Sequence, residues 1–407
     1  MMLSVKSNPL KILPVELSRL SKVKTMELST ENVTFPPPSI SLAGTRRILD
    51  FLRRADRAWA NDVFDLSRLE LDSPPLDVIT LFPKVTRLFI DRNSITKIPF
   101  EFHQMTQLTE LRFDEAIMES PSLEIWSFGL QKALEFMKVI FYARLASAPR
   151  LDFSRWSITF IPDEVLDPTL ACKVMSLDIS HNNLDFLPSE ISVMSSLTSL
   201  TIDNNRLRSL PRQICRLPLL QRLSATCNML EEFPNYLGEL RSLRTLLLQD
   251  NDISLIPRSI VQAAALETID LSRNQIEEFT EGLPSMTSLT CLKVAGNGIS
   301  MLPFEFGQFT QLRELDVDGN PIWSPPADIM RQPRSVWFAY LDRLTRSQEK
   351  LKVKCALWTN RHRPTVPISY VEIKMIQHHD DEISPWQCCG DQNDTALRTP
   401  SLHPAFL

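Results

Sequence analysis

Apolar and polar residues recur at a fixed interval through the middle of the chain. Seven consecutive turns start 23 residues apart, from Val174 and Leu197 through to Leu312. Within a turn, two alternating apolar residues such as Leu200 and Ile202 fit one face of a short strand. Apolar residues then recur three apart, as they do on a helical turn. Each repeat therefore predicts a short strand followed by a helical turn.

A second regular feature is an asparagine at the ninth position of every turn. The chain turns off the strand at this point, and an asparagine amide can both donate and accept hydrogen bonds. We expect these side chains to bond buried backbone groups of adjacent turns, which would otherwise lack partners. The predicted structural ladder comprises Asn182, Asn205, Asn228, Asn251, Asn274, Asn297 and Asn320.

A single turn of this kind cannot fold alone. It buries about seven apolar side chains worth roughly 1.5–3 kcal/mol each, whereas ordering its backbone costs about 1–2 kcal/mol per residue. Stacked neighbours make up the difference. A 23-residue period headed by LxxLxLxxNxL is the signature of the leucine-rich repeat. The predicted fold is α/β: a right-handed leucine-rich-repeat solenoid, or horseshoe, with a concave parallel sheet and helical insertions.

Three proline-containing segments interrupt the repeats, and each precedes a helical pattern. They span residues 36–40, 121–125 and 325–329, and an aromatic–apolar pair stands 11 residues beyond the isoleucine of each. The pairs are Phe51-Leu52, Phe136-Met137 and Tyr340-Leu341. The first pattern places Phe51 and Leu52 on one helix face with Ile48 and Ala55. A run of turns thus closes with a helix three times.

The sequence restarts in a related way after the first two helices. The segment from Phe64 parallels the segment from Leu151, and both replace the asparagine with a bulky apolar residue, Leu69 and Trp156 respectively. We expect the asparagine ladder to be interrupted at these turns. We expect one arch with two helical insertions on its convex side; separate short solenoids joined at the helices are the alternative.

The pattern divides the chain into four predicted parts. Residues 1–60 are N-terminal repeats closing in a helix, and residues 61–147 are a second block with its own closing helix. Residues 148–350 form the main 23-residue array with a C-terminal cap helix, and residues 351–407 are a non-repeat tail. Segments 351–357 and 366–376 alternate enough for short strands, but weak order is expected in the tail as a whole.

Composition narrows the class of protein. Hydrophobic residues make up 43% and charged residues 23% of the 407 residues, as in a globular protein. The net charge of −5 does not show the excess of basic residues that is typical of a nucleic-acid-binding protein. No apolar run approaches the ~18 residues that span a bilayer, and the N-terminus has no signal-peptide core. The seven cysteines do not form the paired clusters that cap extracellular leucine-rich repeats, which favours a reducing cytoplasmic or nuclear setting; we predict the cytoplasm.

The 23-residue turns, the closing segment 319–322 (GNPI) and the helix with Tyr340-Leu341 resemble one intracellular group of leucine-rich-repeat proteins. It contains plant intracellular Ras-group-related proteins, Scribble-type scaffolds and the repeat arms of Roco proteins. The resemblance covers roughly residues 1–350. It implies a non-catalytic protein–protein interaction scaffold or adaptor in intracellular signalling. The implied partner is a protein such as a small GTPase, a kinase or a phosphatase.

Two other functions remain open. One is the regulatory arm of a Roco-type GTPase or kinase that lacks its catalytic domain, and the other is a receptor arm for pathogen or ligand sensing. A GTPase domain follows the repeats in Roco proteins, but residues 359–365 (TNRHRPT) lack the glycines and lysine of a phosphate loop. GTP binding is therefore not predicted. We predict no catalytic residue, cofactor, metal site, nucleic-acid partner or membrane span.

Two further motifs are assigned to packing or chance. Segment 138–141 (KVIF) fits a short docking pattern for a protein phosphatase, but it lies in a helix that already uses Phe136 and Met137 as core. Packing is its expected role. In the tail, His378, His379, Asp380, Asp381, Cys388 and Cys389 lack the spacing that metal ligands need to converge.

The candidate binding site is the concave face, formed by strand positions that point away from the core. Acidic residues outnumber basic ones there, which favours a basic partner. We predict a partner-binding surface that contains Asp178, Asp203, Asp250, Asp270, Lys293, Glu314, Asp316 and Asp318.

Overall fold

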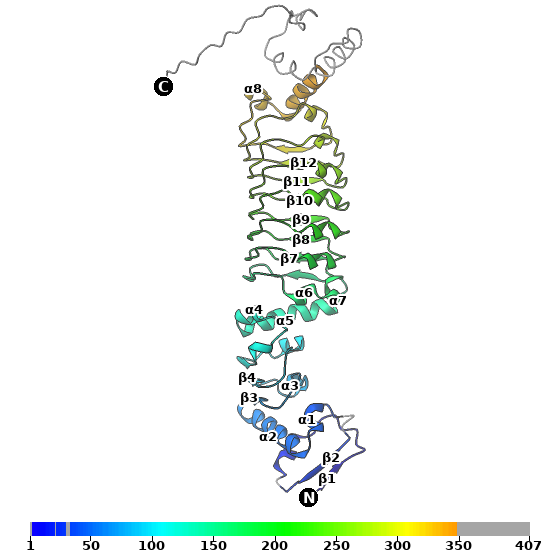
Figure 1. Cartoon of the computed structure of the whole chain (residues 1–407), viewed down its shortest axis with the longest axis vertical. Helices are drawn as coiled ribbons and strands as arrows, with labels where there is room; N and C mark the ends of the chain where they lie inside the picture. Colours follow the sequence, from blue (N-terminus) through cyan, green and yellow to red (C-terminus); the bar gives the residue numbers. More distant parts are fainter. Residues whose placement is uncertain (1, 21, 30–32, 348–407) are drawn as a thin grey trace, which may run out of the picture. The chain divides into compact units, whose positions relative to one another are not determined.

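The computed structural model describes residues 2–20, 22–29 and 33–347, and their strands are short and parallel (Figure 1). In the longest sheet, each step between neighbouring strands from β7 onward advances the chain by one 23-residue turn. Leu200, for example, lies opposite Leu177 on one side and Leu223 on the other. The strands of this sheet, in spatial and chain order, are β6 (Arg150–Asp152), β7 (Ser176–Asp178), β8 (Ser199–Thr201), β9 (Arg222–Ser224), β10 (Thr245–Leu247), β11 (Thr268–Asp270), β12 (Cys291–Lys293) and β13 (Glu314–Asp316).

Two smaller sheets precede the long one. β1 (Met2–Val5) pairs with β2 (Thr25–Leu28), and β3 (Val63–Asp65), β4 (Arg87–Phe89) and β5 (Glu110–Arg112) form a three-stranded sheet. The helix α2 (Thr45–Asn61) follows the first sheet, and α5 (Leu130–Leu145) follows the second. The described strands thus form three separate sheets, as in the alternative arrangement, and not the continuous sheet of the single arch that the sequence led us to expect. The domain boundaries stay predictions.

Pairing stops at these helices because helix side chains occupy the strand edges. Thr45 Oγ1 accepts a hydrogen bond of 2.8 Å from the backbone nitrogen of Met26 in β2. On the other side of α2, Arg54 donates to the carbonyl oxygen of Ser67 at 2.9 Å. At the second junction, Gln131 Nε2 donates to the carbonyl of Leu108 at 2.9 Å. At the first junction, backbone groups of β2 and of the turn after β3 that would pair with a further strand are thus bonded to α2, and at the second junction α5 bonds the backbone just before β5.

Each proline-containing segment forms a short helix before the long one, which confirms the predicted helical insertions. The short helices are α1 (Pro38–Leu42), α4 (Leu123–Ser127) and α8 (Ala327–Met330), and residues 334–347 form the third long helix. The starting turns of the two later sheets carry α3 (Asp77–Leu81), α6 (Asp163–Leu166) and α7 (Pro168–Ala171). Ile48, Phe51, Leu52 and Ala55 of α2 are all buried.

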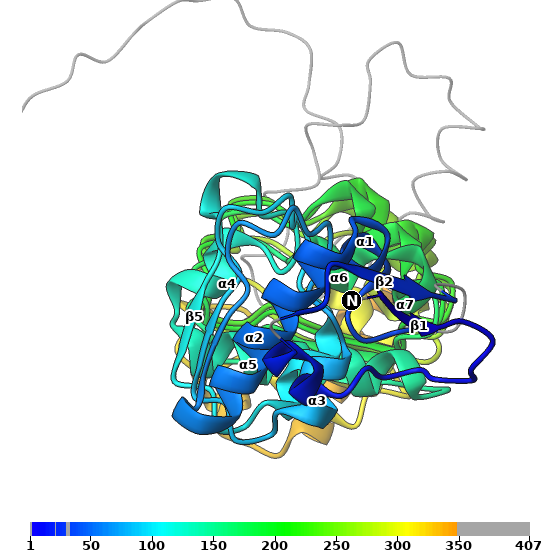
Figure 2. The same cartoon turned by 90° about the horizontal axis from the view of Figure 1, so that it is seen from below.

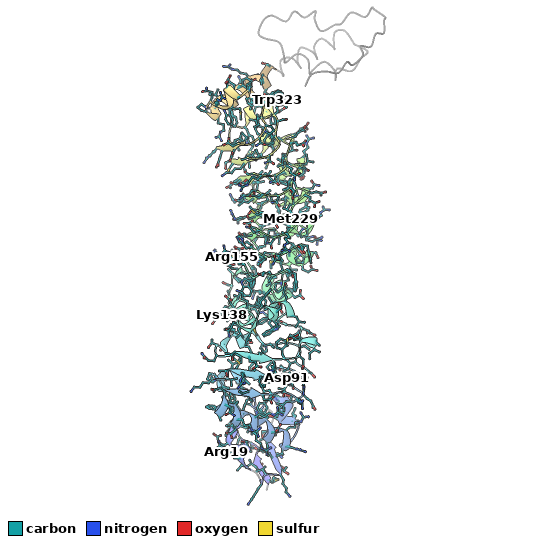
Figure 3. The ribbon with its side chains drawn as sticks, turned by 90° about the vertical axis from the view of Figure 1, so that its left-hand side faces the viewer. Arg19, Asp91, Lys138, Arg155, Met229 and Trp323 are labelled. Atoms are coloured by element: carbon teal, nitrogen blue, oxygen red, sulfur yellow. The ribbon has the colours of Figure 1, made fainter. Side chains whose placement is uncertain are left out.

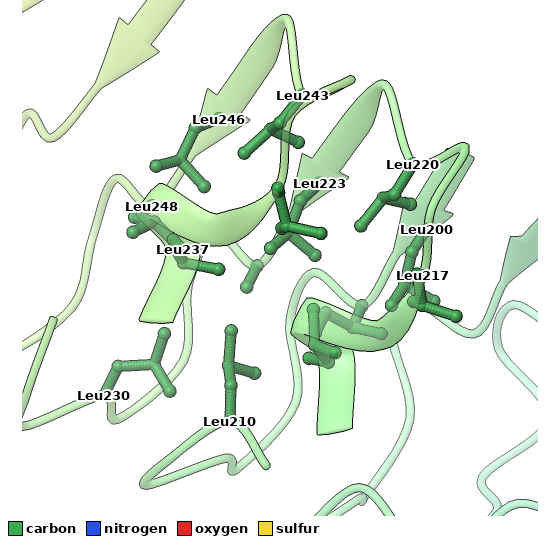
Figure 4. Close-up of a cluster of buried hydrophobic side chains, with 14 of the residues drawn as sticks. Leu200, Leu210, Leu217, Leu220, Leu223, Leu230, Leu237, Leu243, Leu246 and Leu248 are labelled. Carbon is green, nitrogen blue, oxygen red and sulfur yellow. The ribbon is translucent and has the colours of Figure 1, made fainter. Parts of the chain in front are cut away.

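The second half of most turns is a 3-10 helix that lies across from the strand. Five-residue examples are η1 (Val15–Arg19), η2 (Phe100–Gln104), η4 (Ser189–Val193), η5 (Arg212–Arg216), η6 (Asn235–Glu239), η7 (Arg258–Gln262) and η9 (Phe304–Gln308); η3 (Glu115–Ile117) and η8 (Leu283–Ser285) are shorter. Leucines from the strand side and the helix side meet between them, as Figure 4 shows for Leu223, Leu237 and Leu246. These three side chains are fully buried.

The ladder asparagines connect adjacent turns of the long sheet. Asn251 is typical: its Oδ1 accepts from the backbone nitrogen of Leu230 at 3.0 Å, and its Nδ2 donates to the carbonyls of Ala225 and Leu248, each at 3.0 Å. Asn182, Asn205, Asn228, Asn274, Asn297 and Asn320 make equivalent bonds. Each side chain reaches back to the turn before its own.

Because each asparagine bonds the preceding turn, the turns that begin a sheet after a helix can carry another residue at the ladder position. A starting turn has no earlier turn in its sheet, so an asparagine there could bond carbonyls of its own turn but would lack the bonds to a preceding turn. Trp156 instead packs on the closing helix, with the ammonium of Lys132 4.1 Å from its ring centroid and the ring of Phe136 at 6.2 Å. The backbone nitrogen of Trp156 is satisfied by Asn182 of the next turn at 3.0 Å. The described architecture is an α/β leucine-rich-repeat solenoid whose sheet restarts behind each helix.

Candidate functional site

The candidate site is the outward side of strands β6–β13 together with the two or three residues that follow each strand. We call this surface the strand face; it is the face that the sequence analysis predicts to be concave. All eight predicted residues lie on it, because the parallel register repeats each outward position on the neighbouring strand. Lys293, for example, lies opposite Asp270 and Asp316.

The C-terminal end of the strand face contains an ion pair between neighbouring strands. Lys293 Nζ lies 3.0 Å from Glu314 Oε1, and the Cys291 thiol donates to Glu314 Oε2 at 3.4 Å. The hydrogen bonds from Lys293 and Cys291 lower the pKa of Glu314, and the bond to Glu314 raises the pKa of Lys293. Burial raises the pKa of Cys291 to about 11, so this thiol is protonated at neutral pH.

Asp270, Asp316 and Asp318 supply the negative charge that remains at this end. Asp270 Oδ1 accepts from the backbone nitrogen of Ser272 at 3.0 Å, and Asp316 Oδ1 accepts from that of Asp318 at 3.2 Å. Such local bonds fix the positions of the Asp270 and Asp316 side chains. The side chain of Asp318 is exposed. These three carboxylates therefore form a fixed acidic surface next to a neutralised Lys293–Glu314 pair.

The other predicted acids are committed to neighbouring turns or to their own backbone. Asp203 Oδ1 accepts from Ser224 Oγ at 2.7 Å and from the backbone nitrogen of Thr226 at 2.8 Å. Asp250 forms an ion pair with Arg273 at 2.6 Å, which raises the pKa of Arg273. Asp203 and Asp250 thus stabilise the array, and less of their charge is available to a partner. Asp178 makes the same local bond as Asp270, accepting from the backbone nitrogen of Ser180 at 2.9 Å, but it lies in β7, near the other end of the sheet.

The sequence analysis missed an aromatic and cationic surface on the three-stranded sheet. The guanidinium of Arg112 in β5 lies 4.4 Å from the ring centroid of Phe89 in β4. Phe113 packs on Trp126 of α4 at 4.8 Å. The signal was present, because Phe89 and Arg112 are 23 residues apart. It was overlooked because Ala116 replaces the asparagine in that turn.

Side-chain packing, rather than docking, accounts for segment 138–141. The segment lies within α5, where Ile140 is fully buried and Val139 is partly buried against the core of the long sheet. Phe141 stacks on His103 at 4.8 Å. Figure 3 places Lys138 on this part of the chain. These apolar side chains are therefore engaged within the protein.

Within residues 2–20, 22–29 and 33–347, no group of three or more histidine, cysteine or acidic side chains could hold a metal ion. The histidines, aspartates and cysteines of segment 378–389 lie outside the described residues. A search of the described helices found none long and apolar enough to cross a membrane. Cys172, Cys215, Cys227 and Cys291 are free thiols.

Comparison with known proteins agrees with the repeat pattern. Residues 172–230 match the leucine rich repeat family. A leucine-rich repeat and calponin homology domain-containing protein of Drosophila melanogaster is 32% identical over 179 residues, which is 43% of this chain and 19% of the fly protein. The chain thus matches about a fifth of that relative's length.

Solved structures with similar folds come from bacteria and plants. A leucine-rich-repeat protein of Leptospira interrogans gives a TM-score of 0.37 at 18% identity, over 68% of this chain and 95% of that protein. An internalin of Listeria monocytogenes gives 0.39 at 17% identity, over 61% and 65%. The Arabidopsis receptor kinase HAESA gives 0.38 at 22% identity, over 64% and 38%. TM-scores this low carry no functional argument.

Proposed function

We propose that this leucine-rich-repeat chain is a non-catalytic protein-interaction module that binds a basic segment of a partner protein at the C-terminal end of its strand face. The observation that carries the proposal is the trio Asp270, Asp316 and Asp318. Their carboxylates are fixed by local bonds or exposed, and none is paired with a cation in the ion pairs of the described residues. Repeat proteins commonly bind partners along such extended surfaces.

The cellular role follows from the resemblance together with the thiols. An intracellular adaptor in signalling, with a small GTPase, kinase or phosphatase as partner, is what the intracellular leucine-rich-repeat group implies. The four free cysteines of the described residues are compatible with a reducing compartment, and we propose a cytoplasmic location.

Charge reversal on matched faces tests the proposal. The variant Asp270→Lys, Asp316→Lys and Asp318→Lys is compared with Glu232→Lys, Glu278→Lys and Glu305→Lys, which lie on exposed positions away from the strands. Both change the net charge equally. Proteins captured from a native lysate by the wild type should be lost with the first variant and kept with the second.

Once a partner has been identified, the rate of association as a function of salt concentration tests the proposal more specifically. Steering by charge acts on association rate and weakens as salt shortens the screening length to ~3 Å near 1 M. The first variant should associate more slowly at low salt and approach the wild type at high salt. Unchanged binding by the strand-face variant, with binding abolished by removal of residues 351–407, would overturn the proposal.

A further inference from the structure

The three closing helices occupy equivalent places, but they are not equally covered. At the six core positions of each, α2 buries Ile48, Leu49, Phe51, Leu52, Ala55 and Ala58, and α5 buries Ala133, Leu134, Phe136, Met137, Ile140 and Ala143. At the matching positions of helix 334–347, only Leu341 is buried, and Trp337, Phe338 and Tyr340 are partly exposed. Val336, on the same helix, is 38% exposed. Among the described residues, one side of this helix therefore lacks the cover that its two counterparts have.

The cover of α2 and α5 is the starting turn of the next block. Phe51 of α2 lies 6.1 Å from Phe64, and Phe136 of α5 lies 5.6 Å from Phe153, measured between ring centroids. Arg54 of α2 also donates to two carbonyls of that turn, at 3.3 and 2.9 Å. The exposed side of such a helix is thus a surface that accepts a starting turn.

The first turn of the chain is a starting turn whose own outer side is uncovered in the described residues. Leu3 pairs with Met26 in the register in which Phe64 pairs with Leu88. Phe64 is fully buried, whereas Leu3 is partly exposed, and Leu10 is 38% exposed. Figure 2 looks onto this end, with β1 and β2 beside the N-terminus.

We propose that the first turn of one copy of this protein packs on helix 334–347 of a second copy. The two surfaces repeat an interface that the chain forms twice internally, between α2 and β3 and between α5 and β6. Val336 takes the place of Arg47 and Lys132, whose side chains contact the next starting turn.

This contact joins two different surfaces, so it leaves one free surface at each end. Such head-to-tail association continues from copy to copy unless it closes into a ring. Asn8 stands where Leu69 and Trp156 stand in the internal starting turns. The contact therefore buries less apolar surface than the internal ones, and association is weaker than their packing.

Sedimentation equilibrium of the full chain over a wide concentration range tests the proposal. The average mass of the wild type should rise beyond that of two copies. Leu10→Glu and Val336→Glu, which block opposite ends, should each weaken association at least about tenfold, the effect of burying one unpaired charge. Leu255→Glu is the matched control, since Leu255 is 63% exposed away from both ends. Val336→Arg restores the residue type found at Arg47 and should keep association.

A mixture of Leu10→Glu and Val336→Glu is the most discriminating experiment. Each retains the end that the other has lost, so an equimolar mixture should form a one-to-one dimer and nothing larger. Melting curves establish that both variants are folded. A wild type that stays monomeric, a mixture that does not pair, or an equal loss with Leu255→Glu would overturn the proposal. Continued dimer formation by Leu10→Glu alone would also overturn it, because the helices would then pair with each other.

Discussion

Turns inside the long sheet and turns that begin a sheet differ at the ladder position. Inside the sheet, Asn251 bonds the backbone of the turn before it. At the start of the sheet, Trp156 fills that place and packs on Phe136 of the closing helix. The ladder therefore has a direction, because each asparagine bonds backbone groups of the preceding turn. Where a sheet of the second or third block begins, there is no preceding turn, and the residue at the ladder position packs on the closing helix instead. The array of repeats can therefore be interrupted by a helix and begin again, because the helix packs on the first turn of the new sheet.

The largest expected effect is at the covered helix. Phe136 is fully buried between two blocks, so Phe136→Ala should lower the free energy of unfolding by about 3–5 kcal/mol. Tyr340→Ala, at the equivalent position of the less covered third helix, should cost at least about 1 kcal/mol less, because less buried area is lost. Denaturant titration of both variants measures the difference. Equal losses would mean that the two helices are equally covered.

A substitution at the start of the long sheet should be nearly as damaging. Trp156→Asn installs the residue that every later turn carries, yet it removes packing on Phe136, Phe153 and Lys132. The new amide would have no earlier strand to bond. We expect a loss of about 3 kcal/mol. A thermal midpoint at or above that of the wild type would show that the asparagine does not depend on a preceding turn.

Inside the ladder the opposite exchange should cost less but still be measurable. Asn251→Leu leaves the amide of Leu230 and the carbonyl of Ala225 without their buried partner, at about 1–3 kcal/mol. Asn183→Leu is the control, because Asn183 makes only a long bond of 3.4 Å beside the ladder; it should stay within about 0.5 kcal/mol of the wild type. Identical melts for Asn251→Leu and the wild type would rule out the ladder argument.

The smallest effect concerns a cap found in the starting turn of the long sheet. Asp167 Oδ1 accepts from the backbone nitrogen of Thr169 at 2.8 Å and from its hydroxyl at 2.6 Å, and the hydroxyl bond lowers the pKa of Asp167. Asp167→Ala should cost about 1 kcal/mol at neutral pH. Because the folded-state pKa is depressed, this contribution is complete above the unfolded value of about 3.9. It disappears as the pH falls through the lower folded value, and a cost that persists there would contradict the assignment.

Much of this fold follows from periodicity alone. The spacing of leucines and asparagines predicts strands, register and helices, because a 23-residue period places the same side chain on the same face of every turn. The break of the sheet at α2 and α5 was given only as the alternative to one arch. It depends on which side chains bond the backbone beside the strands, such as Thr45, which accepts from Met26, and Gln131, which donates to Leu108, and spacing does not reveal that.

The candidate site was harder to predict in detail. Position on the strand face follows from alternation, and all eight residues lie there. The pairing of Glu314 with Lys293 and of Asp250 with Arg273 depends on side-chain rotamers across neighbouring strands. A count of acidic residues therefore overestimates the charge that a partner meets. At the C-terminal end of the strand face, Asp270, Asp316 and Asp318 are the predicted acids that remain once the ion-paired Glu314 is set aside.

Amide hydrogen exchange in Asn251→Leu tests the direction of the ladder most directly. In the wild type, the backbone nitrogen of Leu230 donates to Asn251, and that of Ile253 donates to Asn274. The account predicts that the variant loses protection at Leu230, in the preceding turn, and keeps it at Ile253, in its own turn. Loss of protection at Ile253 with Leu230 unchanged, or equal loss at both, would contradict it.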